Sequence, residues 1–109
     1  MSTEPLSGEA RTRALAELAA AGWRHDPERD EIRKGWRFAD FSTAFGWMAE
    51  IALIAERADH HPDWRNVWNR VEVALTTHDA GGLTERDLDL AREMDRRAEA
   101  RGAAVLPPG

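Results

Sequence analysis

The chain has 109 residues and a mass of 12.2 kDa, the size of one domain. Hydrophobic residues make up 42% of it and charged residues 32%, so we expect a buried core and exclude a disordered or fibrous protein. The formal net charge of -5 argues against nonspecific binding to nucleic acid, which requires a basic surface. There is no cysteine, which excludes disulfides, thiolate zinc sites, iron–sulfur clusters and cysteine nucleophiles.

No segment has the pattern of a signal peptide or a membrane-spanning helix. Residues 1–10 lack a basic stretch followed by an apolar run. The most apolar stretch, 41–58, is interrupted by Glu50, Glu56 and Arg57. We therefore expect a cytoplasmic protein that does not contact a membrane.

The first third of the chain predicts a helix followed by a β-hairpin. Ser7 is suited to cap the helix, and Gly22 is suited to end it. Apolar residues alternate in the run 31–38, which predicts a strand paired with residues 23–25. The polar residues 26–30 between them predict a surface turn.

The longest predicted helix follows the cap candidate Asp40 and covers residues 41–58. It carries two apolar stripes. The first stripe comprises Phe41, Phe45, Met48, Ala52 and Ala55, and the second comprises Ala44, Trp47, Ile51, Ile54 and Ala58. A helix on a single sheet buries one stripe, so we infer that the second packs against another subunit. The alternative is that the first and third helices cover it.

The second half predicts two more strands and a third helix. Residues 64–68 and 71–77 form the strands, with Val71, Val73, Leu75 and Thr77 on one face and Glu72, Ala74, Thr76 and His78 on the other. A flexible turn at 79–82 leads to a capping box at 84–87, and the helix ends at Arg101-Gly102. The order αββαββα predicts a single α+β domain over 1–109, with an antiparallel sheet and its helices on one face. Its core spans about 7–100, and 101–109 is expected to be a loose tail.

Two adjacent histidines, His60 and His61, lie where the long helix ends. Pro62 disfavours helical geometry at His61, and the negative end of a helix favours a protonated imidazole. His78 ends the last strand, where the loop 59–63 could reach it, so three imidazoles could surround one cleft. Neutralisation of the helix dipole is the simpler alternative. Neighbouring histidines seldom face one ion, so we expect no metal.

Three further residues have more than one interpretation. Asp87 is explained as the third residue of its capping box, and a supporting role in a site stays open. Trp64 could line a pocket for a flat ring, whereas the other tryptophans are expected in the core. His25 has no companion and is expected on the surface.

The spaced set of histidines and its flanks resemble the pterin-4a-carbinolamine dehydratase family over about residues 23–98. The matching segments are Asp59-His60-His61-Pro62, Trp68, His78 and Asp87, with Phe38-Ala39-Asp40-Phe41, Asn66-Val67-Trp68-Asn69, Thr77-His78-Asp79 and Gly82-Leu83-Thr84 around them. Trp68 stands where tyrosine is more usual, and Asp63 replaces a common glutamate.

The resemblance implies a four-stranded antiparallel sheet with three helices packed on one face, and a homodimer or homotetramer, the tetramer built on the long helix. The implied reaction is loss of water from 4a-hydroxytetrahydropterin, which gives quinonoid dihydropterin for reduction and reuse by an aromatic amino acid hydroxylase. It implies no metal and no organic cofactor. A carbinolamine loses hydroxide from C4a more easily when an acid protonates that oxygen and a base takes the N5 proton, and imidazoles suit both tasks.

The resemblance also implies roles for individual residues. His60 and His78 correspond to the acids that serve the two faces of C4a, and His61 to a substrate-binding residue and candidate base. The substrate-binding set implied for the pterin pocket is Asp59, His60, His61, Pro62, Trp64, Thr76, Thr77, His78 and Asp79.

Two other functions compete with this one. The first is a non-catalytic binding or assembly protein on the same fold, like dehydratase-like Rubisco assembly factors or an animal coactivator. The retention of all three histidines favours the enzyme, and substitution of Trp47 or Ile51 is expected to change assembly without touching the pocket. The second is a metal-dependent hydrolase, which retained zinc or iron would reveal.

Overall fold

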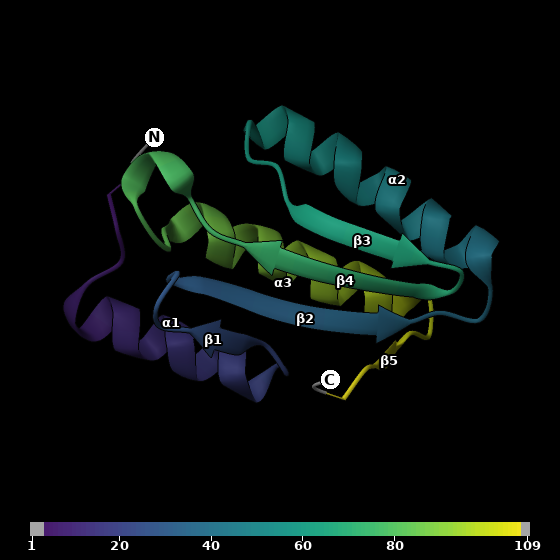
Figure 1. Cartoon of the computed structure of the whole chain (residues 1–109), viewed down its shortest axis with the longest axis horizontal. Helices are drawn as coiled ribbons and strands as arrows, with labels where there is room; N and C mark the ends of the chain where they lie inside the picture. Colours follow the sequence, from purple (N-terminus) through teal and green to yellow (C-terminus); the bar gives the residue numbers. More distant parts are fainter. Residues whose placement is uncertain (1–3, 108–109) are drawn as a thin grey trace.

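A computed structural model describes residues 4–107 and shows one antiparallel sheet with three helices on one face (Figure 1). The elements in chain order are α1 (Gly8–Ala20), β1 (Arg24–Asp26), β2 (Glu31–Arg37), α2 (Phe41–Ala58), β3 (Asp63–Val67), β4 (Arg70–Leu75), the 3₁₀ turn η1 (His78–Ala80), α3 (Glu85–Ala100) and β5 (Ala104–Val105). The main strand order is β1-β2-β4-β3, and β5 adds to β2. The predicted α+β fold is confirmed. Within the described residues, no helix is both long and apolar enough to span a membrane.

Local capping signals set most of the helix boundaries. The Asp40 side chain accepts a hydrogen bond from the Thr43 N–H, which starts α2 as predicted. Thr84 starts α3 with a complete capping box. Ser7 stands at the N-cap of α1, but its side chain makes no capping hydrogen bond. At the other end of α1, Gly22 adopts φ 95° and lets the Trp23 N–H reach the Leu18 carbonyl.

The core is centred on Trp47 of α2, which is fully buried. Its ring centroid lies 4.9 Å from that of Trp36, 5.3 Å from that of Phe38 and 6.2 Å from that of Trp64. Its indole N–H also donates to the carbonyl oxygen of Met94 in α3 at 3.2 Å. Trp47 therefore joins α2 to β2, β3 and α3 at once.

Lys34 of β2 is a buried cation on the helix side of the sheet, with a side chain only 4% exposed. Its ammonium donates to the Asp95 carboxylate of α3 and to the carbonyl of Ala21 at the end of α1. It also lies 5.9 Å from the Trp23 ring centroid and 5.2 Å from that of Trp36. Ionic, hydrogen-bonding and aromatic partners together compensate for its removal from water.

The prediction of a loose tail over residues 101–109 is wrong for the segment that forms β5. Ala104 and Val105 pair with Arg37 and Trp36 of β2, and the Leu106 N–H donates to the Gly35 carbonyl at 2.9 Å. The reason is that β1 pairs only with the first three residues of β2, so the same edge is left open further along. The tail fills that edge and makes the sheet five-stranded. Residues 108–109 lie outside the described residues.

The assignment of the second α2 stripe to a subunit contact is wrong for its central residues. Trp47 and Ile51 are fully buried inside the monomer, where Trp36 and Trp64 of the sheet and Met94 of α3 contact Trp47, so the third helix but not the first covers this stripe as the alternative interpretation had it. The exposed apolar side chains of α2 are instead Phe41, Phe45 and Leu53, which are 50%, 57% and 67% exposed. Substitution of Trp47 or Ile51 would therefore disturb the core of the monomer. Substitution of Phe41, Phe45 or Leu53 is the appropriate test for assembly.

Asp30, in the turn between β1 and β2, binds three other parts of the chain. Its carboxylate accepts two hydrogen bonds from Arg11 at 2.7 and 3.1 Å and one from the Leu83 N–H at 3.0 Å, and it lies 2.7 Å from His25 Nε2. The expectation that His25 has no companion is therefore wrong. The Arg11 guanidinium, with smaller help from His25 and the Leu83 N–H, holds the pKa of the Asp30 carboxyl well below its usual range.

This shift predicts an acid-dependent loss of stability. The pKa of Asp30 is lower in the folded chain than in the unfolded chain, where it is about 3.9. The unfolded state therefore takes up the proton first, and the free energy of unfolding should decrease as the pH falls below about 5. Urea denaturation from pH 7 to pH 2 should show a smaller decrease for Asp30→Asn than for the wild type. Identical pH profiles would contradict this assignment.

Candidate active site

The site begins where α2 ends and the chain turns back toward the sheet. Asp59 adopts the left-handed conformation, with φ 51°, and the His60 N–H donates to the Ala55 carbonyl at 3.0 Å. This turn directs His60 inward, where it is only 6% exposed. In Figure 1, the end of α2, the turn η1 and the start of α3 lie at the same end of the sheet.

His60 forms a buried hydrogen bond with Asp87 of α3, with 2.6 Å between Nε2 and Oδ1. The other Asp87 oxygen accepts from the Thr77 hydroxyl at 2.8 Å and from the Thr84 N–H at 2.9 Å. The Thr77 and Thr84 hydroxyl oxygens lie 2.8 Å apart. Asp87 is 1% exposed. One of its oxygens closes the capping box and the other binds His60, so Asp87 is both a helix-capping residue and a neighbour of the site histidine.

His61 and His78 lie on the surface. The Nε2 atom of His61 is 2.9 Å from the Oε1 atom of Glu56, and both side chains are exposed. His78 is exposed in η1, and its ring makes no hydrogen bond or ion pair within residues 4–107. The prediction that His78 ends a strand is wrong: β4 ends at Leu75, and a bridge between Thr77 and Gly82 turns the chain into η1.

The other predicted site residues have varied surroundings. Asp59 and Asp79 are exposed, and Pro62 is half-buried. Thr76 donates its hydroxyl to the Asp30 carbonyl at 2.8 Å. Trp64 is half-buried against Trp47, as a core residue would be.

Two residues near the histidines are not in the predicted set. Glu56 binds His61, and the only signal in the sequence is its position in the last turn of α2. Arg86 donates from Nη1 to the Asp59 carbonyl at 3.4 Å, and its Nε atom is buried without a hydrogen bond in the described structure. Its place inside the capping box gave no reason to select it.

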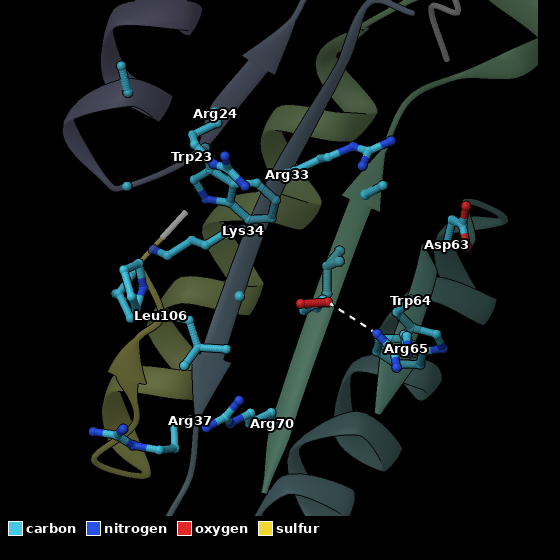
Figure 2. A pocket seen from close by; sticks show the side chains of 18 residues that line it. Trp23, Arg24, Arg33, Lys34, Arg37, Asp63, Trp64, Arg65, Arg70 and Leu106 are labelled. Atoms are coloured by element: carbon cyan, nitrogen blue, oxygen red, sulfur yellow. Dashed lines mark ion pairs between the residues drawn. The ribbon is translucent and has the colours of Figure 1, made fainter. Parts of the chain in front are cut away.

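A separate hollow of about 1000 Å³ lies on the face of the sheet away from the helices (Figure 2). Arginines from four strands or strand ends line it, among them Arg33, Arg37, Arg65 and Arg70, and none of the three site histidines does. The Arg65 guanidinium lies 3.9 Å from the Glu72 carboxylate there, as the dashed line in Figure 2 marks. In residues 4–107, no group of three or more His, Cys, Asp or Glu side chains could hold a metal ion.

Fold and site together define a small α+β protein with a buried histidine–aspartate pair and two surface histidines at one end of its sheet. Residues 4–97 match the family described as "Pterin 4 alpha carbinolamine dehydratase", and the chain belongs to this family. The resemblance seen in the sequence is thereby confirmed.

Individual relatives agree with this membership. Two curated proteins named "Putative pterin-4-alpha-carbinolamine dehydratase" are similar to the chain. The one from Rhodopseudomonas palustris (strain HaA2) is 54% identical over 101 residues, which cover 93% of this chain and 98% of that protein. The one from Jannaschia sp. (strain CCS1) is 51% identical over 96 residues, which cover 88% and 98%. A crystal structure named "transcriptional coactivator/pterin dehydratase" from Brucella melitensis is similar with a TM-score of 0.79 and 45% identity, covering 87% of this chain and 99% of that one.

Proposed function

We propose that this protein dehydrates 4a-hydroxytetrahydropterin to quinonoid dihydropterin and water by histidine acid–base catalysis. The observation that carries the proposal is the buried hydrogen bond between His60 and Asp87, beside loops that expose His61 and His78. Family membership supports the substrate class. The product would be reduced and reused by an aromatic amino acid hydroxylase, which is the proposed metabolic partner.

The reaction needs one proton donated and one removed. Hydroxide leaves C4a as water when an acid protonates it, and loss of the N5 proton completes the double bond. Imidazole is suited to both transfers near neutral pH, and such catalysis commonly contributes about 10²- to 10⁴-fold to a rate. No redox change occurs, so the chemistry requires only proton transfer and positioning.

We propose that the three histidines divide these tasks. Asp87 binds Nε2 of His60, which fixes the ring and leaves Nδ1 for the substrate. A carboxylate in that place also balances the positive charge of a protonated ring. We assign His60 and His78 as the acids on the two faces of C4a. His61, bound to Glu56, is assigned as a substrate-binding residue and candidate base.

The remaining residues of the proposed pterin pocket come from the same two regions of the chain. Asp59 and Pro62 lie between α2 and β3, and Trp64 lies in β3. Thr76 and Thr77 precede η1, and Asp79 lies within it. The Thr77 hydroxyl is occupied by Asp87 and Thr84, and its backbone N–H and carbonyl are hydrogen-bonded to Gly82, so we propose that Thr77 shapes the pocket wall and supports Asp87. Asp87 is assigned as the residue that positions His60.

The test is the rate of quinonoid dihydropterin formation from freshly generated 4a-hydroxytetrahydropterin, followed by absorbance. The wild type is expected to accelerate the spontaneous reaction at least about 100-fold. A rate equal to the spontaneous one would overturn the proposal and favour a non-catalytic binding protein on this fold. Metal analysis of the same sample distinguishes a metal-dependent hydrolase, which would retain stoichiometric zinc or iron and lose it in His60→Ala.

We further propose that the exposed apolar face of α2, formed by Phe41, Phe45 and Leu53, is where copies of the chain associate as a homodimer or homotetramer. The rings of Phe41 and Phe45 pack together at 5.9 Å and form one apolar patch, and Leu53 is exposed further along the same helix. Phe45→Glu is expected to lower the molar mass measured by light scattering, whereas Glu99→Lys on exposed α3 is not. A monomeric wild type would contradict the assignment.

A further inference from the structure

We propose that Asp30 is a positioning residue for the histidine site, although it lies in the turn between β1 and β2. This inference rests on the proposed function, and it concerns a residue outside the predicted site set. We call residues 76–77 and 82–83, where the loop 76–83 begins and ends, its neck. Asp30 is hydrogen-bonded to both sides of this neck. The loop carries His78 and the Thr77 hydroxyl that binds Asp87, and Thr84, whose N–H also binds Asp87, follows it directly.

The loop is closed at its neck by its own backbone. The Thr77 N–H donates to the Gly82 carbonyl at 3.2 Å, and the Gly82 N–H donates to the Thr77 carbonyl at 3.3 Å. On either side of this bridge, the Thr76 hydroxyl donates to the Asp30 carbonyl at 2.8 Å, and the Leu83 N–H donates to its carboxylate at 3.0 Å. One residue therefore binds the chain both where it enters the loop and where it leaves.

The contact with Gly82 leaves no room for a side chain. A Cβ atom at this position would lie 2.4 Å from the Asp30 Oδ2 atom, well inside van der Waals contact. Asp30 cannot easily withdraw, because Arg11 and His25 also bind its carboxylate. Its own backbone is in the left-handed region, with φ 48°. The Asp30 carboxylate is therefore held in place, and the Gly82 backbone packs directly against it.

The neck is connected directly to the buried pair. Thr84, the residue after Leu83, donates its N–H to Asp87, and Thr77 donates its hydroxyl to the same carboxylate oxygen. Asp87 in turn binds His60. A displacement of the neck would move both donors to Asp87 together with His78. An error of about 1 Å in a catalytic group can lower a rate by about 100-fold.

Two variants test the contact from its opposite sides. Asp30→Ala removes the carboxylate that contacts the neck, and Gly82→Ala introduces a Cβ atom that clashes with this carboxylate. Each is expected to lower kcat about 10- to 100-fold at a temperature where the variant is folded. In the double variant, the alanine at position 82 no longer meets a carboxylate, so kcat should be no lower than in Asp30→Ala alone. Independent, multiplying losses would overturn the proposal.

A matched control separates positioning from a general loss of stability. Glu17 of α1 forms a bidentate ion pair with Arg92 of α3, at 2.7 and 2.8 Å, and neither residue contacts the neck. Glu17→Ala therefore removes an ion pair of α1 of the same kind and should change kcat less than twofold. If Asp30→Ala lowers only the melting temperature and keeps the wild-type kcat, Asp30 is merely structural and the proposal fails.

A readout that does not depend on activity keeps this proposal distinct from the proposed function. Hydrogen exchange and NMR of the His60 ring can be measured even if the wild type shows no dehydratase activity. In Asp30→Ala, the Leu83 amide should exchange roughly tenfold faster or more, and the His60 ring signals should shift. Glu17→Ala should leave both unchanged. Wild-type exchange and ring signals in Asp30→Ala would overturn the positioning role.

Discussion

Replacing His60 with alanine is expected to slow the catalysed dehydration of 4a-hydroxytetrahydropterin by about 100-fold or more. The substitution removes an acid that is only 6% exposed and is held by one hydrogen bond to Asp87. A water molecule in the space left by the ring would not be held in the orientation that Asp87 gives to the imidazole. The measurement is the initial rate of quinonoid dihydropterin formation, with the spontaneous rate subtracted.

The control is Glu17→Ala, which removes a side chain outside the site. Glu17 pairs with Arg92 and contacts neither Asp30 nor the histidines, so the rate of this variant should stay within about twofold of the wild type. Circular dichroism must show that both variants are folded at the assay temperature. A folded His60→Ala protein with the wild-type rate would remove His60 from the mechanism.

Replacing Trp47 with alanine is expected to lower the free energy of unfolding by about 3–5 kcal/mol. The side chain is fully buried, and three aromatic neighbours would be left facing a cavity. The substitution also leaves the Met94 carbonyl without its indole donor. Urea denaturation followed by circular dichroism, at one fixed protein concentration, measures the loss.

Val67→Ala provides the comparison for this prediction. Val67 is 53% exposed near the β3–β4 turn, so its truncation should cost less than about 1 kcal/mol. Since Trp47 lies on the stripe first assigned to a subunit contact, the experiment also separates the two interpretations of α2. A Trp47→Ala loss below about 1 kcal/mol would contradict its place in the monomer core.

The parts of the fold that could be predicted from sequence are those fixed by neighbouring residues. The side chains of Asp40 and Thr84 cap the two longest helices by binding backbone N–H groups no more than three residues further along the chain, so the sequence alone predicts both helix starts. Alternation along β2 and β4 likewise predicts which residues face the helices. The buried Lys34 breaks this pattern, because partners from other elements compensate for its charge.

The features that sequence did not reveal depend on contacts between distant segments. β5 forms because β1 is short and leaves an edge of β2 open, which no local pattern in residues 104–105 signals. Both α2 stripes are apolar, and contacts with distant residues such as Trp36, Trp64 and Met94 decide that Trp47 is buried.

The candidate site divides in the same way. The histidines and Asp87 were identified from spacing, whereas the joint role of Asp87 required the fold to bring His60 to it across 27 positions. Asp30 gave no signal at all, because its partners lie in α1, in the first hairpin and in the segment before α3.

The burial of Lys34 has a practical consequence for chemical labelling. It is the single lysine in the sequence, and its ammonium is enclosed by Asp95, Ala21 and two tryptophan rings. Amine-directed reagents should therefore spare Lys34 in the folded protein. Acylation of Lys34 would occur only in molecules that have opened, so an adduct located at Lys34 by mass spectrometry would report unfolding.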